Sequence, residues 1–271
     1  MSPAAAQTGT STAAPPLFTG GDALLASGIV LSAFLARPLD ERYAKRLQDS
    51  STQANEHLHT ISTAVRVTVA PGSYVIGTSM YAAGRLFKID KMATLGLRGT
   101  EALVVGEAVG GVLKGFIGRQ RPYVEPQDSH SIEFMRGFRK GDDYQSFPSG
   151  HSLAAFGVAA AVTSETSGWW PGSRWIIGPA MFGGATLTAM SRMYDNKHWM
   201  SDVIVGGGLG TFAGLKVVRY HNAHPGSRFD NVLLGASIVP TSGGGHALHW
   251  SISPAPHFGE VAGRPALRST R

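Results

Sequence analysis

The sequence predicts an all-α fold, a bundle of about six helices with a small C-terminal β-hairpin. Apolar residues recur with helical spacing in several long stretches of the 271-residue chain, and strands and helices do not alternate. Only 15% of the residues are charged and 35 are glycine, a composition that suits closely packed helices. We therefore divide the chain into a disordered leader (1–21), a helical domain (22–222) and a hairpin with a loose tail (223–271).

The leader precedes an apolar stretch, residues 23–36. This stretch is shorter than a typical membrane span, and no Lys or Arg comes before it. The opening letters SPAAAQ resemble the end of a signal-peptide cleavage region. We hypothesise that this start lies within a longer secretory leader, truncated here. We expect a bacterial cell-envelope protein that is periplasmic and soluble, or membrane-associated.

Further helices are expected along the rest of the domain, and residues 39–67 form the one with the clearest amphipathic pattern. The others are 67–84, which Pro71 interrupts, 94–121, 152–166, 175–190 and 201–218. The helix 94–121 contains Arg98, Glu101 and Glu107. Ionisable groups are costly at bilayer depth unless they face a protein interior, so this helix favours a soluble or peripheral protein over an integral one.

Glycines recur every four residues in two of these helices. Gly206, Gly210 and Gly214 form one such series, and Gly106 with Gly110 forms another. Each glycine costs about 1 kcal/mol relative to alanine in a helix interior. The spacing therefore predicts smooth faces on which helices approach closely. A phosphate-binding glycine loop is disfavoured because no strand precedes these glycines.

The C-terminal hairpin is predicted from two short apolar runs. Residues 231–240 and 246–254 read as strands, and a TSGGG turn lies between them. A lone hairpin is marginally stable in water, so we expect it to pack on the bundle.

The charge balance narrows the class of partner. The formal net charge is +6 and the isoelectric point is about 9.7, which favours anionic partners such as phosphate esters or anionic lipid surfaces. No run of five or more basic residues occurs, which argues against nucleic acid. The chain has no cysteine, so disulfides, thiolate metal sites and cysteine nucleophiles are excluded.

The first polar motif, KGFIGRQRP, contains two cations. Lys114 and Arg121 are seven residues apart, which on a helix places both on one face roughly 10 Å apart. Pro122 would then end the helix. Taken alone, the pair also fits ordinary snorkelling cations at a helix end.

The second motif, FPSGHS, precedes an apolar helix. Ser149 and Gly150 occupy the expected N-terminus, where free N–H groups and the helix dipole favour an anion, and His151 lies at the same point. The simpler alternative is a serine N-cap followed by an incidental histidine.

The third motif, SRMYDNKHWMSD, combines an arginine, a histidine and an aspartate. His198 and Asp202 are four residues apart, so a helical turn would bring imidazole and carboxylate together. Such a carboxylate fixes the tautomer of a histidine and raises its basicity. Arg192 offers a planar fork suited to phosphate oxygens. A polar turn with a surface salt bridge is the alternative interpretation.

Together, the three motifs resemble the signature of the type 2 phosphatidic acid phosphatase superfamily, which includes class A bacterial acid phosphatases and vanadium-dependent haloperoxidases. The pattern reads K-x6-R-P at 114–122, P-S-G-H at 148–151 and S-R-x5-H-x3-D at 191–202. Every signature position is filled, and the resemblance extends over roughly residues 90–220. It implies an all-α bundle, in agreement with the helical periodicity.

The resemblance also implies a role for each motif residue. His198 would be the nucleophile that forms a phosphohistidine, and Asp202 would orient it. His151 would protonate the leaving oxygen and then activate water. The phosphate oxygens would be held by Lys114, Arg121, Arg192, Ser149 and Gly150. The resemblance requires no metal and no other cofactor, and vanadate is expected to inhibit.

These roles predict a metal-independent phosphatase that hydrolyses a phosphate monoester or pyrophosphate through a phosphohistidine. Its partner would be a phosphorylated lipid, such as phosphatidate or prenyl pyrophosphate, or a small phosphate ester, with a membrane surface as a second partner and no nucleic acid. The alternative is a vanadium-dependent haloperoxidase on the same scaffold, with vanadate as its cofactor. Those enzymes are usually longer than this chain.

Overall fold

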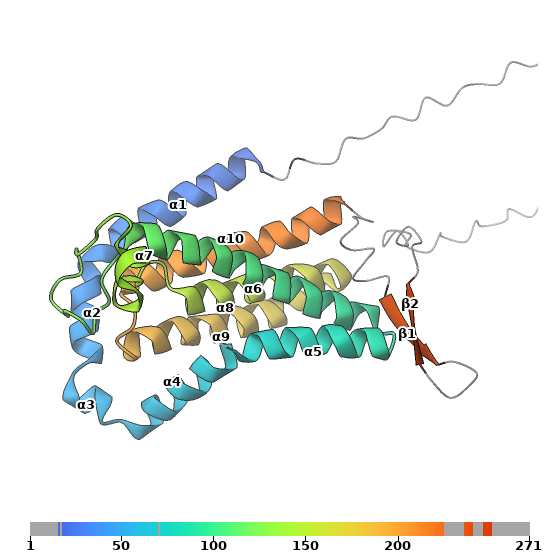
Figure 1. Ribbon diagram of the computed structural model, residues 1–271, viewed down its shortest axis with the longest axis horizontal. Helices are drawn as coiled ribbons and strands as arrows, with labels where there is room; N and C mark the ends of the chain where they lie inside the picture. Colours follow the sequence, from blue (N-terminus) through green and yellow to red (C-terminus); the bar gives the residue numbers. More distant parts are fainter. Residues whose placement is uncertain (1–15, 17, 70, 225–235, 241–245, 251–271) are drawn as a thin grey trace, which may run out of the picture.

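An elongated helical bundle accounts for most of the chain (Figure 1). The computed structural model describes residues 16, 18–69, 71–224, 236–240 and 246–250. The helices are α1 Gly20–Ala36, α2 Asp40–Leu47, α3 Ser50–Gln53, α4 Glu56–Val69, α5 Gly72–Leu86, α6 Asp90–Ile117, α7 Arg136–Lys140, α8 Gly150–Trp169, α9 Arg174–Tyr194 and α10 Met200–Ala223. The prediction of an all-α bundle is confirmed for this helical part.

Helix α8 lies at the centre of the bundle. It packs against α6, α9 and α10, while α1 lies along α10, α5 along α6 and α4 along α9 (Figure 1). Consecutive alanines at 159, 160 and 161 are buried in α8, and small side chains let several helices surround it. The helix that begins at the second motif is therefore the one that the others surround.

The glycine series on α10 produces the closest helix contact. A Cβ atom added at Gly206, Gly210 or Gly214 would overlap the backbone carbonyl oxygens of Ser149, Leu153 and Gly157 on α8. Only glycine permits backbones to approach so closely. The predicted close packing is confirmed at these positions, and it fixes the start of α8 against the start of α10.

The prediction of one helix over residues 39–67 is wrong. Two polar side chains break it into α2, α3 and α4 because each satisfies the backbone N–H groups of a new helix start. The carboxylate of Asp49 accepts from the Ser51 N–H at 3.1 Å. The Asn55 side chain accepts from the backbone N–H groups of His57 and Leu58 at 3.0 and 3.2 Å.

The prediction that Arg121 lies on the same helix as Lys114 is also wrong. Helix α6 ends at Ile117, and Gly118 follows in the left-handed conformation with φ of 56°. Glycine adopts this conformation readily and commonly ends a helix, so the chain turns away before Pro122 is reached. Arg121 therefore lies in the connection between α6 and α7, and its closeness to Lys114 depends on tertiary structure.

Two strands follow the bundle. Strand β1, Ala236–Pro240, pairs antiparallel with β2, His246–Trp250, with Ala236 opposite Trp250 (Figure 1). The remainder of the two expected strands, 231–235 and 251–254, lies outside the described residues, as does most of the expected leader.

Candidate active site

The three motifs meet at one end of the bundle, beside α2 and α7 in Figure 1. Lys114 lies in the last turn of α6, Arg192 in the last turn of α9, and His151 in the first turn of α8. The imidazole of His151 is within electrostatic range of Arg192, His198, Lys114 and Arg121. Residues from positions 114 to 198 therefore surround one small volume.

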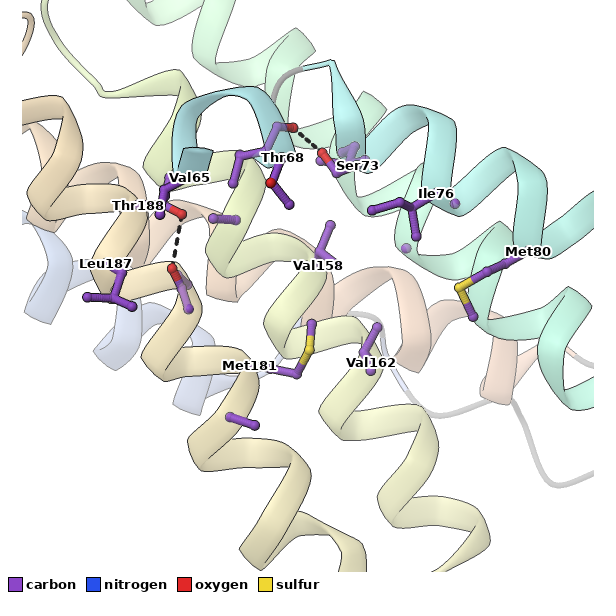
Figure 2. A pocket seen from close by; sticks show the side chains of 18 of the residues that line it. Val65, Thr68, Ser73, Ile76, Met80, Val158, Val162, Met181, Leu187 and Thr188 are labelled. Carbon is purple, nitrogen blue, oxygen red and sulfur yellow. Dashed lines mark hydrogen bonds between the residues drawn. The ribbon is translucent and has the colours of Figure 1, made fainter. Parts of the chain in front are cut away.

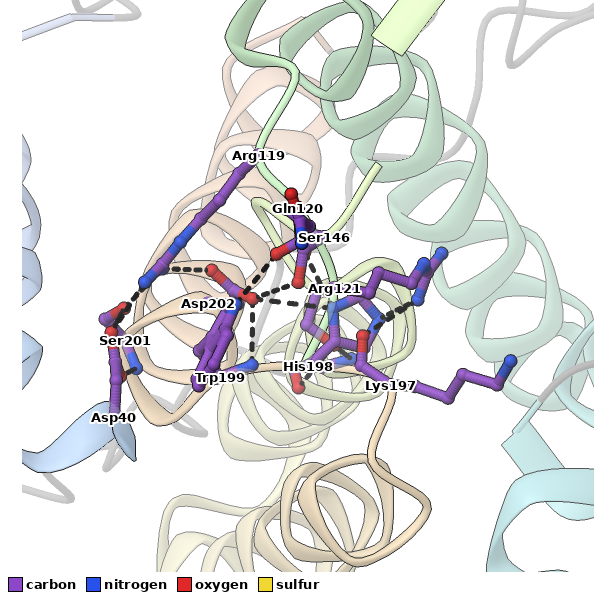
Figure 3. Close-up of polar contacts among 12 residues, drawn as sticks. Asp40, Arg119, Gln120, Arg121, Ser146, Lys197, His198, Trp199, Ser201 and Asp202 are labelled. Carbon is purple, nitrogen blue, oxygen red and sulfur yellow. Dashed lines mark hydrogen bonds and ion pairs between the residues drawn. The ribbon is translucent and has the colours of Figure 1, made fainter. Parts of the chain in front are cut away.

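His198 lies in the connection between α9 and α10 and is 3% exposed. Its Nδ1 atom is 2.7 Å from the carbonyl oxygen of Ser146 (Figure 3). A carbonyl oxygen can only accept a hydrogen bond, so Nδ1 carries the proton and Nε2 carries the lone pair. That Nε2 atom faces the guanidinium of Arg121, with Nη1 at 3.3 Å. The tautomer is the one required of a nucleophile at Nε2.

The environment of His198 keeps its imidazole neutral. Burial lowers its pKa from 6.5 to about 4, and the positive charges of Arg121 and Lys114 act in the same direction. The Asp202 carboxylate opposes this shift but does not outweigh burial. At neutral pH, Nε2 is therefore unprotonated and able to attack phosphorus.

Asp202 does not receive the expected direct hydrogen bond from His198. Its Oδ2 atom is 3.8 Å from Nδ1, which is within ion-pair distance but too long for a hydrogen bond. The carboxylate instead accepts from the Ser146 hydroxyl at 2.5 Å and from the Trp199 N–H at 2.9 Å. His198 and Asp202 do not share a helical turn, because α10 begins at Met200 and His198 lies before it. It therefore acts on His198 electrostatically, and Ser146 fixes the ring.

The second motif begins α8 as predicted. The Ser149 side chain caps the helix by accepting from the Ser152 N–H at 3.4 Å, and its own N–H donates to the Asp202 carbonyl oxygen at 3.0 Å. A Cβ atom added at Gly150 would be 2.8 Å from Nζ of Lys114. The free N–H groups of the helix start and the lysine ammonium thus lie side by side, an arrangement that favours a bound anion.

Two arginines complete the cationic side of the site. Arg121 and Arg192 are each 6% exposed, and each is held by one carboxylate. Arg121 Nη2 is 2.6 Å from Asp142, and Arg192 Nη1 is 2.7 Å from Asp195. Each aspartate orients its guanidinium. Arg121 also donates to the carbonyl oxygens of Asp142 and Lys197 at 2.7 and 3.0 Å, whereas the bond from Arg192 to Asp195 leaves other N–H groups of Arg192 for a ligand. With Lys114, the site presents three cations around His151 and His198.

The sequence patterns missed several residues of this site. Ser146 and Asp142 lie in the polar insert between the first two motifs, and Asp195 lies inside the third. The sequence signal for these residues was their position within or close to the motifs along the chain. Arg119 and Asp40 are buried behind Asp202 and bind to each other at 2.7 Å (Figure 3). No local pattern marks that pair, because its members are 79 residues apart.

Part of the chain matches a known protein family. The family model of the PAP2 superfamily matches residues 97–225. An undecaprenyl-diphosphatase from Sulfolobus acidocaldarius is 28% identical over 132 residues, which cover 49% of this chain and 58% of that protein. A lipid A 1-phosphatase from Porphyromonas gingivalis is 32% identical over 77 residues, 27% of this chain and 16% of that protein. The chain thus spans little more than half of the first relative.

A solved structure shares the fold. It is the crystal structure of a transmembrane PAP2 type phosphatidylglycerolphosphate phosphatase from Bacillus subtilis, with a TM-score of 0.52 and 21% identity. The match covers 76% of this chain and 98% of that chain. The matched residues 97–225 contain all three motifs and the helices that bring them together. Residues 97–225, which contain the complete signature, thus match the PAP2 superfamily, and the bundle shares the fold of a PAP2 type phosphatase.

Proposed function

We propose that the protein is a metal-independent lipid phosphate phosphatase that works through a phosphohistidine at His198. The observation that carries the proposal is the state of that side chain. It is buried and neutral, and the Ser146 carbonyl holds Nδ1 so that the Nε2 lone pair faces Arg121. A nucleophile aimed at a cluster of cations matches the requirements of phosphoryl transfer. The relatives named above are phosphatases, and nothing favours the haloperoxidase alternative.

In the first step, the Nε2 lone pair attacks phosphorus in line with the ester or anhydride oxygen. An N–P bond forms and the P–O bond to the leaving group breaks. His151 is surrounded by cations that disfavour its protonated form. It is protonated once the negative charge of the bound phosphate offsets those cations, and it then gives this proton to the departing oxygen. Lys114, Arg121 and Arg192 neutralise charge on the other phosphate oxygens. The imidazolium that results keeps its proton on Nδ1, bonded to Ser146 and 3.8 Å from the Asp202 carboxylate.

In the second step, water attacks the phosphohistidine. His151, now neutral, takes a proton from the water as the new P–O bond forms. The P–N bond breaks and its electron pair returns to Nε2. Inorganic phosphate is released, and both histidines regain the states in which they began.

An apolar cavity supports a lipid as the substrate. It has a volume of about 540 Å³ and lies between α4, α5, α6, α8 and α9 (Figure 2). Its lining begins at Ala155 and Thr188, each four residues, or about 6 Å of helix, from His151 and Arg192. It continues to Val162 and Met181, about 10 Å further along. A phosphate held at the histidines would have its hydrocarbon chain beside this cavity.

The outer surface of the bundle supports a membrane location. Large apolar side chains are exposed on the outside of several helices, including Leu24, Val30, Leu31, Phe34 and Leu35 on α1, Val75 on α5, and Val104, Val105, Val109 and Val112 on α6. Soluble monomers rarely expose so large an apolar area. By length and composition, Gly20–Leu47 and Met200–Ala223 are able to cross a bilayer. We propose that the bundle is embedded in a membrane.

The ionisable residues of α6 do not oppose this location. Arg98 is 5% exposed and lies 3.3 Å from Glu101 and 3.7 Å from Glu165 of α8. Glu101 is also 2.9 Å from His221 of α10. These groups point into the bundle and pair with one another, which removes most of the cost of placing charge at bilayer depth. The membrane alternative is therefore favoured over the soluble one.

The test is phosphate release by the purified full-length chain in detergent, with a prenyl diphosphate, a phosphatidate and an aryl phosphate as substrates. We expect turnover that persists in EDTA, falls with orthovanadate and is lost in His198→Ala. Quenching in alkali should trap a phosphoenzyme that is stable in base and labile in acid. His130→Ala, which changes an exposed histidine, is the matched control and should retain wild-type turnover. Activity in His198→Ala would overturn the assignment.

A further inference from the structure

A buried network behind the nucleophile begins outside the matched residues 97–225. Asp40, the first residue of α2, is 1% exposed, and Arg119 is 2% exposed. Arg119 Nη2 is 2.7 Å from Asp40, and Nη1 is 2.6 Å from Asp202 (Figure 3). All five N–H groups of this guanidinium have acceptors: the two carboxylates, the Ser201 hydroxyl and, twice, the carbonyl oxygen of Ser129.

Asp40 also holds the start of α10. Its Oδ1 atom accepts from the Ser201 N–H at 2.8 Å and its Oδ2 atom accepts from the Ser201 hydroxyl at 2.7 Å. Ser201 and Asp202 lie in the first turn of α10, so one carboxylate from α2 anchors both the helix start and the arginine that binds Asp202. The N-terminal segment is thereby joined to the support of His198.

We infer that Asp40 and Arg119 are positioning residues of the reaction, and that α2 completes the active site. This inference rests on the proposed phosphohistidine function. Neither residue touches the phosphate site. They act through Asp202, whose carboxylate Arg119 fixes and whose helix start Asp40 anchors. The match to the family model begins at residue 97, so α2 lies outside it.

The charges of the network match the intermediate better than the resting state. Asp40, Arg119 and Asp202 together carry one net negative charge, which is surplus while His198 is neutral. Phosphorylation converts the imidazole to an imidazolium with one positive charge, and the sum becomes zero. Buried charges that become balanced only in the intermediate stabilise it relative to the ground state. A purely structural ion pair requires no such surplus.

The groups that face His198 from every side determine what a pH profile would report. Asp202 and, beyond it, Arg119 and Asp40 lie behind Nδ1, while Arg121 and Lys114 lie toward Nε2. His151 faces it from the start of α8. Removing the Asp40 charge disfavours the imidazolium, so the acid limb of kcat/KM should move to lower pH. Removing the Arg119 charge favours the imidazolium, so the limb should move to higher pH.

The experiment compares the full-length wild type with Asp40→Asn, Arg119→Gln and Ser201→Ala on one lipid phosphate, measuring kcat, KM, the pH profile and the thermal unfolding temperature. We expect Asp40→Asn and Arg119→Gln to lower kcat by about 10- to 100-fold, as residues that orient active-site groups typically do, with KM changed less than about twofold. Their acid limbs should move in opposite directions. Ser201→Ala removes one bridging hydroxyl but no charge, and should lower kcat without moving the limb.

Glu41→Gln is the matched control. Glu41 follows Asp40 on α2 and accepts from Ser129 at 2.8 Å, but does not bind Arg119 or Asp202. It should leave kcat and the acid limb unchanged. The inference would be overturned if Asp40→Asn folds and keeps the wild-type kcat and pH profile. It would also be overturned if the acid limbs of Asp40→Asn and Arg119→Gln move in the same direction. If the charge variants do not fold, wild-type kcat in Ser201→Ala overturns it. Absence of turnover in the wild type overturns the proposed function itself and this inference with it.

Discussion

The carbonyl oxygen of Ser146 accepts the Nδ1 proton of His198 at 2.7 Å, and the hydroxyl of the same serine donates to Asp202 at 2.5 Å. One residue of the polar insert thus fixes both the tautomer of the nucleophile and the carboxylate near it. A backbone acceptor is not removed by side-chain substitution, so the tautomer should persist in variants of Asp202.

Asp202→Asn should therefore lower kcat by about 10- to 100-fold while leaving measurable turnover, because the carboxylate stabilises the imidazolium but does not hold the ring. His198→Ala should leave none through the phosphohistidine. The measurement is kcat for both variants on the same lipid phosphate, with melting temperatures to show that they are folded. Equal loss in the two variants would mean that Asp202, and not Ser146, sets the ring.

The pH dependence follows from the lowered pKa of His198. Because burial lowers that pKa to about 4, kcat/KM should not fall at pH 6.5 from titration of this residue, and its acid limb should lie near pH 4. The measurement is the kcat/KM profile of the wild type together with an NMR titration of its His198 imidazole. An acid limb near 6.5 with His198 titrating at the same pH would contradict the buried, neutral state.

Stability should change over the same range. Between the unfolded value near 6.5 and the folded value near 4, the unfolded chain binds the proton more readily than the folded one. The contribution of His198 to stability is therefore present above pH 6.5 and is lost as pH falls toward 4. The thermal unfolding temperature of the wild type should decline over this interval more steeply than that of His198→Phe.

The cavity predicts a chain-length test with adjacent glycines. Gly184 lines the cavity, whereas Gly183 does not, and an added Cβ meets no atom within 4 Å at either position. Gly184→Leu should fill the cavity and raise KM for long-chain lipid phosphates, by up to about fourfold for each methylene displaced, since each buried methylene contributes about 0.8 kcal/mol. Turnover of an aryl phosphate should be unchanged.

Gly183→Leu, with the same added volume on the neighbouring face, should affect neither substrate. Kinetics on a homologous series of chain lengths would measure the difference. Equal effects of the two leucines, or none, would place the hydrocarbon chain elsewhere.

The contact between α8 and α10 predicts opposite effects at two glycines. A methyl group at Gly210 would overlap the Leu153 carbonyl, so Gly210→Ala should destabilise the fold by about 1–3 kcal/mol. It should also lower kcat, because α8 and α10 carry the two histidine motifs. Gly111 has open space at its Cβ, and Gly111→Ala should stabilise by about 0.4–1 kcal/mol. Unfolding in detergent would rank the two variants against the wild type.

Local sequence patterns predict the features that depend on residues close to one another along the chain. The start of α8 at the second motif and the glycine face of α10 follow from residues within one turn or one helix face, and both were predicted. The Ser149 cap was the simpler alternative for that motif. The end of α6 was misplaced because Gly118 and Pro122 are competing stop signals four residues apart, and the nearer one determines the end. This displaced Arg121 from the helix without removing it from the site.

The remaining errors concern contacts across the fold. Asp40 and Arg119 are separated by 79 residues, and neither position has a periodicity or spacing that indicates a partner. The same holds for Ser146, because it holds His198 through its backbone carbonyl and a pattern of side chains does not indicate a backbone contact. A single sequence can identify the groups that react, but the groups that hold them in place are determined by tertiary packing.

The lining of the cavity and the reacting groups come from different parts of the chain. The reacting groups lie at the ends of α6, α8 and α9 and in the connections that follow α6 and α9, all inside residues 97–225. Val65, Thr68, Ile76 and Met80 of the cavity lining instead come from α4 and α5, before the family match begins. Mutations in 56–86 can therefore change which lipid is accepted without disturbing the histidines. The segment that shapes the lipid site is thus separate in sequence from the one that carries the chemistry, and a designer could exchange it to redirect the enzyme.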